Sequence, residues 1–305
     1  KSYFESNQYD AVILFGWNMV LFWQAIWWAK KYNISLILRA ESNLKHTQSW
    51  FTKLIKKVLF PILFKQFKAF MSIGSLNSEL YLHYGVQKTA IYDAPYCVDN
   101  DFFAEGASKS AIEARQLRLS LGIPESDTVF LFMAKFVDRK RPLDLIAAAV
   151  KNREYSNFHV ILVGGGELME ACQSAITTNQ IDNVHLVGFI NQTELPTYYA
   201  AADVFVLPSH YETWGLVLNE AMACGLPGIV SDTCGATQDM IIEGETGYSY
   251  PMGDVQQLAK LMMLMTDNSD DCQRMGLRAA DHVQNFSVPV VVSSLKNILQ
   301  DINKK

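Results

Sequence analysis

Residues 202–227, with the sequence ADVFVLPSHYETWGLVLNEAMACGLP, decide the fold class of this chain. The run Val204–Leu207 is apolar, as in a buried strand, and a Pro-Ser pair ends it. A run of small and apolar residues at helical spacing begins at Leu216 and ends at Gly225. A buried strand, a loop and a helix in this order form the repeating unit of a parallel α/β sheet.

Two carboxylates lie in this unit, Glu212 in the predicted loop and Glu220 one turn inside the predicted helix. Ligands of α/β proteins bind outside the carboxyl ends of the strands. Gly215 and the amides of the first helical turn would offer N–H groups to an anion there. The carboxylates would accept hydroxyl protons on either side of that anion. Phosphate flanked by hydroxyl groups describes a nucleotide-sugar.

Strand and helix patterns alternate through the rest of the second half, which predicts a parallel sheet with helices on both faces. The expected strands are Val129–Ala134, Phe158–Val163, Val184–Leu186, Val204–Leu207, Gly228–Ser231 and Gly247–Tyr250. The expected helices include Pro142–Val150, Glu167–Thr177 and Thr193–Ala200. The tail, Val288–Asn303, repeats apolar residues at helical spacing and predicts a closing helix.

The first hundred residues predict part of a second α/β domain, without a first strand before Ala11 or an early glycine-rich turn. We therefore expect three regions: a truncated or reduced N-terminal Rossmann-like domain at 1–100, a nucleotide-sugar-binding Rossmann-like domain at 101–287, and a closing helix at 288–305 that packs back on the first domain. A linker is expected around Pro95–Phe102. The expected strands of the first domain are Ala11–Phe15, Ile34–Leu38, Ala69–Ile73 and Thr89–Tyr92.

Residues 11–29 carry no charge, and nineteen such residues could just span a bilayer. Gly16, Asn18 and Gln24 interrupt the run, and its aromatic residues fill the interior rather than marking its two ends. This pattern favours a strand that turns at Gly16 into a buried helix, with a transmembrane segment as the alternative. Residues 1–10 are polar and contain acids, unlike a signal peptide.

Composition restricts the class of protein further. The chain has 305 residues, of which 50% are hydrophobic, enough for two domains with sizeable cores. Its net charge of −5 makes nucleic acid a poor partner. Five scattered cysteines without a C-x-x-C pair predict reduced thiols in a cytosolic protein and no zinc site.

Three further segments follow predicted strands and could contact a ligand. After Ala134, the run KFVDRKRP contains Lys135 and Lys140, which could converge on a diphosphate. Gly164 and Gly165 follow the next strand, where glycine lets backbone approach a ligand closely. A solvated basic turn and an ordinary tight turn are the structural alternatives. Ile190, after the third strand, lies where main-chain groups could hold a base edge.

In combination these segments resemble the nucleotide-binding domain of the family 4 retaining glycosyltransferases, which have the GT-B fold. The resemblance runs in order through residues 128–265. It comprises Ala134-Lys135-Phe136…Lys140, Val163-Gly164-Gly165-Gly166, Gly188-Phe189-Ile190, Ala202–Ser209, Glu212…Glu220, Ala221–Pro227, Gly235 and Gly244–Tyr248. Lys135 stands where the family usually has arginine, which keeps the charge but loses the planar fork.

The resemblance implies a role for each matched position. Lys135 and Lys140 would neutralise the departing diphosphate, and Glu212 would contact the transferred sugar. The amides of Trp214, Gly215 and Leu216 would bind its hydroxyls and the distal phosphate. Glu220 would bind the ribose, and the region of Ile190 the base. The departing phosphate would take the acceptor's proton on the same face, without a protein nucleophile, a metal or another cofactor.

The resemblance predicts a GT-B glycosyltransferase with two Rossmann-like domains and an unidentified acceptor, which could be envelope polysaccharide or lipid-linked. The family's N-terminal glycine-rich loop has no counterpart in residues 1–100. This favours, as an alternative, a non-catalytic nucleotide-sugar-binding module or half of a split glycosyltransferase. A third and weaker alternative is a GT-B-like sugar-nucleotide epimerase.

Residues 49–68 hold five lysines, no acids and many large apolar residues. A basic amphipathic segment of this kind predicts contact with anionic lipid, and a buried helix with lysine stems along its surface is the alternative. We therefore expect a cytoplasmic protein that can work at the inner face of the membrane.

Overall fold

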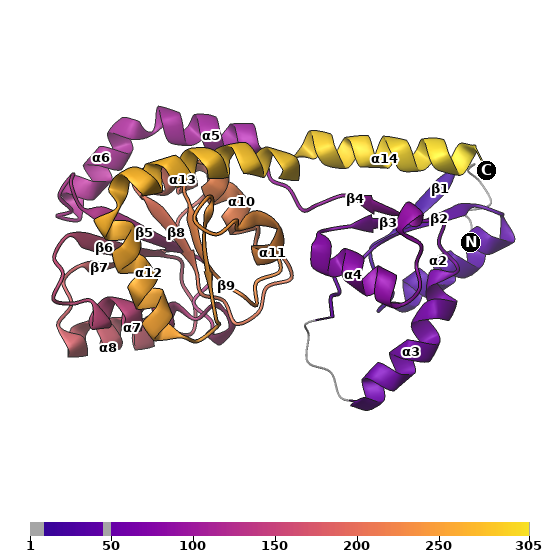
Figure 1. Cartoon of the computed structure of the whole chain (residues 1–305), viewed down its shortest axis with the longest axis horizontal. Helices are drawn as coiled ribbons and strands as arrows, with labels where there is room; N and C mark the ends of the chain where they lie inside the picture. Colours follow the sequence, from indigo (N-terminus) through magenta and orange to yellow (C-terminus); the bar gives the residue numbers. More distant parts are fainter. Residues whose placement is uncertain (1–8, 45–49, 305) are drawn as a thin grey trace. The chain divides into compact units, whose positions relative to one another are not determined.

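The computed structural model describes residues 9–44 and 50–304, which form two compact units (Figure 1). Unit 1 comprises residues 1–96 and 288–305, and unit 2 comprises residues 97–287. The first eight residues, and Ser49 at the start of the basic segment, lie outside the described part of the chain.

Unit 1 is a parallel four-stranded sheet in the order β1-β2-β3-β4, with helices on both faces. Because side chains alternate along a strand, Leu36 and Leu38 of β2 pack with α2, α3 and α4, whereas Ile37 packs with α14. The elements are β1 (Ala11–Leu14), α2 (Val20–Lys31), β2 (Ser35–Arg39), α3 (Trp50–Phe64), β3 (Ala69–Ser72), α4 (Ser75–His83), η1 (Lys88–Ala90), β4 (Ile91–Asp93) and α14 (Val288–Asn303).

The expected buried helix after Gly16 is wrong in one respect. The chain does turn at Gly16, where φ is +114°, and α2 follows. Only Ile26 and Ala29 of this helix are buried, whereas Trp23 and Trp27 are about half exposed. A helix covers a sheet with one stripe only, so its outer side stays open unless another element packs on it. Within residues 9–44 and 50–304, no helix has the length and apolar character to cross a bilayer.

The last strand of unit 1 is also displaced from its expected position. It begins at Ile91 rather than Thr89, because residues 88–90 form a 3₁₀ turn. Thr89 suits a strand by its own propensity, so the 3₁₀ turn rather than the residue type sets the start of β4.

Unit 2 contains a parallel six-stranded sheet in the order β10-β9-β8-β5-β6-β7. Its elements are α5 (Asn100–Lys109), α6 (Ala111–Ser120), β5 (Thr128–Met133), η2 (Asp138–Lys140), α7 (Pro142–Lys151), β6 (Phe158–Val163), α8 (Met169–Asn179), β7 (Val184–Gly188), η3 (Gln192–Glu194), α9 (Leu195–Ala200), β8 (Val204–Leu207), α10 (Leu216–Ala223), β9 (Gly228–Ser231), α11 (Thr237–Met240), β10 (Gly247–Tyr250), α12 (Val255–Asp267), α13 (Ser269–His282) and η4 (Val283–Phe286).

The expected linker is shorter than predicted, since α5 begins at Asn100 rather than after Phe102. The Asp99 carboxylate accepts a hydrogen bond of 3.0 Å from the Phe102 amide and so caps the helix.

The strand order of unit 2 reverses between β5 and β8, which are neighbours in the sheet although β6 and β7 separate them in sequence. From β5 the chain proceeds outward through β6 and β7, then returns to β8 and proceeds outward through β9 and β10. Ligands of open α/β sheets bind at the carboxyl ends of the strands near such a reversal.

Candidate active site

A pocket of about 770 Å³ lies in unit 2, at the carboxyl ends of β5, β6 and β7. Lys135 follows β5 in its wall, Gly164 and Gly165 follow β6, and Ile190 follows β7. Glu220 reaches the pocket from α10. Five residues that the sequence identified as site candidates therefore meet in one cavity.

Two of the pocket's glycines serve different purposes. Gly164 has φ +134°, and a Cβ there would lie 1.9 Å from the carbonyl oxygen of Ala134. Its amide donates a 2.8 Å hydrogen bond to the carbonyl of Gly188. Gly164 thus joins the ends of the three strands. A Cβ on Gly165 would meet nothing within 4 Å, so this glycine leaves the backbone open to a ligand.

Glu220 combines partial burial with a single strong partner. The buried Tyr199 hydroxyl donates a 2.7 Å hydrogen bond to Glu220 Oε2. Burial raises the pKa of the Glu220 carboxyl, and the hydrogen bond from Tyr199 offsets part of this rise. A carboxylate held in this way can accept a hydrogen bond from a ligand hydroxyl.

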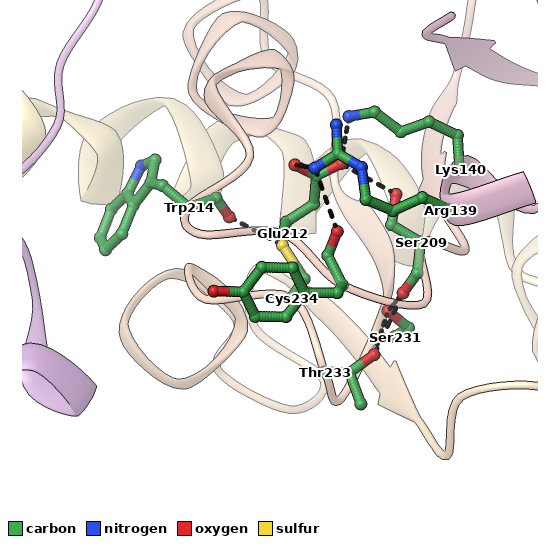
Figure 2. Close-up of polar contacts among 9 residues, drawn as sticks. Arg139, Lys140, Ser209, Glu212, Trp214, Ser231, Thr233 and Cys234 are labelled. Atoms are coloured by element: carbon green, nitrogen blue, oxygen red, sulfur yellow. Dashed lines mark hydrogen bonds and ion pairs between the residues drawn. The ribbon is translucent and has the colours of Figure 1, made fainter. Parts of the chain in front are cut away.

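The second carboxylate, Glu212, forms a buried ion pair with Lys140 (Figure 2). The Lys140 and Glu212 side chains are only 15% and 9% exposed. Ser209 Oγ donates to Glu212 Oε1 at 3.2 Å, and Arg139 Nη1 lies 3.5 Å from Oε2. Lys140 follows β5 and Glu212 follows β8, so the ion pair joins the loops at the reversal of strand order.

The loop that carries Glu212 is fixed by two hydrogen bonds to its backbone carbonyls. The Gly235 amide donates to the Glu212 carbonyl at 3.0 Å, and the Cys234 thiol donates to the Trp214 carbonyl at 2.8 Å. Burial raises the pKa of the Cys234 thiol to about 12, so it remains protonated and keeps donating. These bonds hold the loop, and the side chains of Lys140 and Ser209 hold the Glu212 carboxylate.

Helix α10 begins beside this loop without a side-chain cap. Gly215, with φ +110°, occupies the N-cap position, and Leu216 is the first helical residue. The first amides of a helix have no intrahelical acceptor and favour an anion. The Trp214 indole points away from Lys140 in Figure 2, and its N–H donates to Asn219 Oδ1 at 2.8 Å. The Trp214 side chain therefore packs within unit 2, and only its backbone remains a site candidate.

The structure gives the two predicted lysines different surroundings. Lys135 lines the pocket, whereas Lys140 is paired with Glu212. Sequence reasoning missed three neighbours: Arg139, Tyr199 and Phe189. The first lies in the basic run already quoted, and the last is an aromatic side chain 83% exposed in the pocket wall. Nothing in the sequence connects Tyr199 with Glu220, since 21 residues separate them.

No metal-binding arrangement is evident in the part of the chain that the structure describes. Across residues 9–44 and 50–304, no three His, Cys, Asp or Glu side chains lie close enough together to hold a metal ion. The cationic groups next to the pocket and the Glu212 loop are the lysines and the arginine named above.

Comparison with known proteins agrees with this geometry. Residues 113–282, more than half of the chain, match the model of the family described as Glycosyl transferases group 1. The D-inositol 3-phosphate glycosyltransferase of Corynebacterium diphtheriae is 27% identical, over 74% of this chain and 54% of its own length. The N-acetyl-alpha-D-glucosaminyl L-malate synthase of Bacillus anthracis is 30% identical, over 61% and 49%. The chain thus spans about half the length of the curated relatives it matches.

Solved structures share the fold at low sequence identity. A glycosyltransferase from Rickettsia africae has a TM-score of 0.81 at 17% identity, covering 100% of this chain and 79% of that one. Anabaena HepE in complex with UDP has a TM-score of 0.75 at 19% identity, covering 91% and 75%. These neighbours are GT-B glycosyltransferases, so the predicted α/β fold class with two parallel sheets is confirmed.

Proposed function

Because the chain belongs to the group 1 glycosyl transferases, we propose that it transfers a sugar from a nucleoside diphosphate sugar to an acceptor hydroxyl with retention of configuration. The observation that carries this proposal is the meeting of Lys135, Gly165 and Glu220 in one pocket, at the carboxyl ends of the strands of unit 2. A cation, an open backbone turn and a carboxylate fit a diphosphate that is flanked by hydroxyl-bearing groups.

In this proposal each end of the donor has its own partners. The exposed ring of Phe189 and the backbone near Ile190 contact the base, and Glu220 accepts hydrogen bonds from the ribose hydroxyls. Lys135 and the first amides of α10 bind the diphosphate. The sugar then extends toward the loop of Glu212, and the Glu212 carboxylate accepts a hydrogen bond from one of the sugar's hydroxyls.

The chemical step breaks the bond between the anomeric carbon and the diphosphate, whose oxygen keeps the electron pair. The acceptor oxygen bonds to the anomeric carbon on the same face, and its proton passes to the departing phosphate. Lys135, Lys140 and Arg139 stabilise the growing negative charge, in place of a metal ion. Cations fixed before the reaction act mainly on the transition state, which raises the rate.

Retention without a covalent intermediate is supported by the environment of Glu212. Lys140 binds one carboxylate oxygen and Arg139 lies 3.5 Å from the other. A carboxylate neutralised by two cations is a weak nucleophile, so we assign it to binding rather than to attack.

For the place of action we propose the cytosol, where nucleotide-sugars and reduced thiols occur together. All five cysteines are free, and Cys172, Cys234 and Cys272 are buried. The acceptor is an alcohol, and a polysaccharide or a lipid-linked saccharide supplies one.

The test begins with the donor, which thermal-shift screening with uridine, guanosine and adenosine diphosphate sugars identifies by mass action. Release of nucleoside diphosphate is then measured for Glu220→Gln and Lys140→Ala. We expect each substitution to slow turnover 10²–10³-fold, about 2–4 kcal/mol of transition-state stabilisation. The matched controls, Glu154→Gln and Lys151→Ala, lie at exposed positions and should retain the wild-type rate. Unchanged turnover in both site variants contradicts the assignment, and NMR of the product's anomeric carbon tests retention.

A second candidate is a nucleotide-sugar-binding module, or one half of a split enzyme. It is favoured by the family match, which falls within unit 2, the unit that holds the pocket. Calorimetric binding of the donor without release of nucleoside diphosphate, with and without added acceptors, would support this candidate over the first.

A further inference from the structure

Helix α3 in unit 1 presents a continuous apolar surface to solvent. Seven large apolar side chains form two rows in which the members are four residues apart, and residues at this spacing adjoin on a helix. Their exposed fractions run from 42% at Ile55 to 75% at Trp50. This surface, here called the α3 apolar face, comprises Trp50, Leu54, Val58 and Ile62 in one row and Phe51, Ile55 and Leu59 in the other.

The fold of unit 1 already uses the opposite side of this helix. Phe60, Leu63 and Phe64 are buried in the core beneath α3, and the Trp17 ring contacts Phe60 with ring centroids 5.0 Å apart. Docking of α3 on the sheet is therefore satisfied without the α3 apolar face. Monomeric soluble proteins seldom leave an apolar patch of this kind uncovered unless another surface binds it.

The charge around the α3 apolar face indicates what kind of partner surface it binds. Residues 42–78 contain six lysines and no Asp or Glu, in a chain whose net charge is −5. Lys53 and Lys57 are exposed on α3 itself, and Lys65 and Lys68 are exposed just after it. An apolar stripe beside cations without acids is complementary to a bilayer with anionic headgroups.

Helix α2 repeats the pattern on the same side of the sheet. Trp23 and Trp27 are half exposed, and Lys31 Nζ lies 5.5 Å from the centre of the Trp27 ring. Both helices contribute buried side chains to one core cluster on one face of the sheet. Tryptophan beside lysine is typical of the boundary between headgroups and acyl chains.

We propose that unit 1 docks on an anionic lipid bilayer through the α3 apolar face. The helix lies in the plane of the membrane, with its apolar rows among the acyl chains near the surface and its lysines at the phosphate groups. With 15 residues, α3 lays about 22 Å of helix on the lipid. This inference goes beyond the proposed transfer reaction and stands without it, because it concerns only unit 1.

The test is flotation of the whole chain with two kinds of vesicle, phosphatidylcholine alone and an equal mixture with phosphatidylglycerol. We expect binding to the anionic vesicles only. The charge variant Lys53→Gln/Lys57→Gln/Lys65→Gln should lower the partition coefficient about a hundredfold, since each lysine contributes about 1 kcal/mol near such a surface. The apolar variant Leu54→Ser/Val58→Ser/Ile62→Ser should lower it by at least as much.

The matched controls carry the same number of substitutions, placed in unit 2 instead of unit 1. Lys109→Gln/Lys151→Gln/Lys260→Gln removes three exposed lysines of unit 2, and Ile112→Ser/Leu119→Ser/Leu277→Ser removes three apolar side chains of unit 2 that are 71–75% exposed. Both controls should bind as the wild type does. Circular dichroism checks that each variant is folded. We expect every variant to fold, because the substituted side chains are exposed.

Three outcomes would overturn the proposal. One is no binding of the wild-type chain to anionic vesicles, and another is unchanged binding of the folded apolar variant. The third is a dimer in light scattering that the apolar variant dissolves while vesicle binding stays the same. In that case a second copy of the chain, rather than lipid, covers the α3 apolar face.

Discussion

Replacing Lys140 with methionine keeps the length of the side chain and removes the charge that faces Glu212. The Glu212 side chain is 9% exposed, so water cannot solvate its carboxylate once Lys140 has gone. Removing one partner of a buried ion pair costs about 3–5 kcal/mol. Ser209 at 3.2 Å and the half-exposed Arg139 at 3.5 Å retain part of the interaction. We therefore expect unit 2 to lose about 2–3 kcal/mol of unfolding free energy.

Thermal unfolding followed by circular dichroism measures this loss. For a unit of this size the melting temperature should fall by about 4–12 °C. The double variant Lys140→Met/Glu212→Gln should recover about half of the loss, because it also neutralises the stranded carboxylate. Lys151→Met, on the exposed side of α7, is the matched control and should change stability by less than about 0.5 kcal/mol. The buried pair does not stabilise unit 2 if Lys140→Met has the same melting temperature as the control. The same conclusion follows if adding Glu212→Gln to Lys140→Met lowers the melting temperature further.

Three further predictions address the pocket and the sheet. Glu220→Gln should weaken nucleotide binding about 10–100-fold in calorimetry without lowering the melting temperature, because glutamine keeps a hydrogen-bond acceptor while the buried charge disappears. Gly164→Ala should lower the melting temperature, since its Cβ would lie 1.9 Å from a carbonyl oxygen, whereas Gly165→Ala has space and should change nucleotide binding alone. Burial lowers the pKa values of His159 and His185, so the unfolded chain binds more protons below about pH 6.5 and stability falls as the pH drops through that window. His185→Gln should flatten the dependence of the melting temperature on pH there, and a curve that keeps its wild-type slope would contradict the assignment.

The sheet of unit 2 could be predicted closely because its strands are short apolar runs between turn residues. Strands β6 and β8 have the predicted bounds, since Gly164 and Pro208 end them in the sequence as in the structure. The exposed outer side of α2 could not be predicted. Its tryptophans read as core residues, and only the packing of unit 1 decides which side of the helix is covered.

Prediction of the site was limited in a similar way. Lys135 and Gly165 could be proposed because each follows the carboxyl end of a strand in the sequence, and Glu220 because it lies inside the helix that follows β8. The pairing of Lys140 with Glu212 could not, because 72 residues separate them. Only the neighbouring positions of β5 and β8 in the sheet bring these residues together, and that order does not follow from the order of the strands along the chain.

The last helix, α14, belongs to unit 1, although unit 2 lies between them in the chain. During translation, the face of the first sheet that holds Ile37 and Met71 therefore stays uncovered by Ile298 until residues 97–287 have been synthesised. At ordinary speeds of translation this delay lasts roughly 10 to 40 seconds. The nascent chain thus carries an uncovered apolar surface while unit 2 is synthesised, which makes its yield sensitive to chaperone supply.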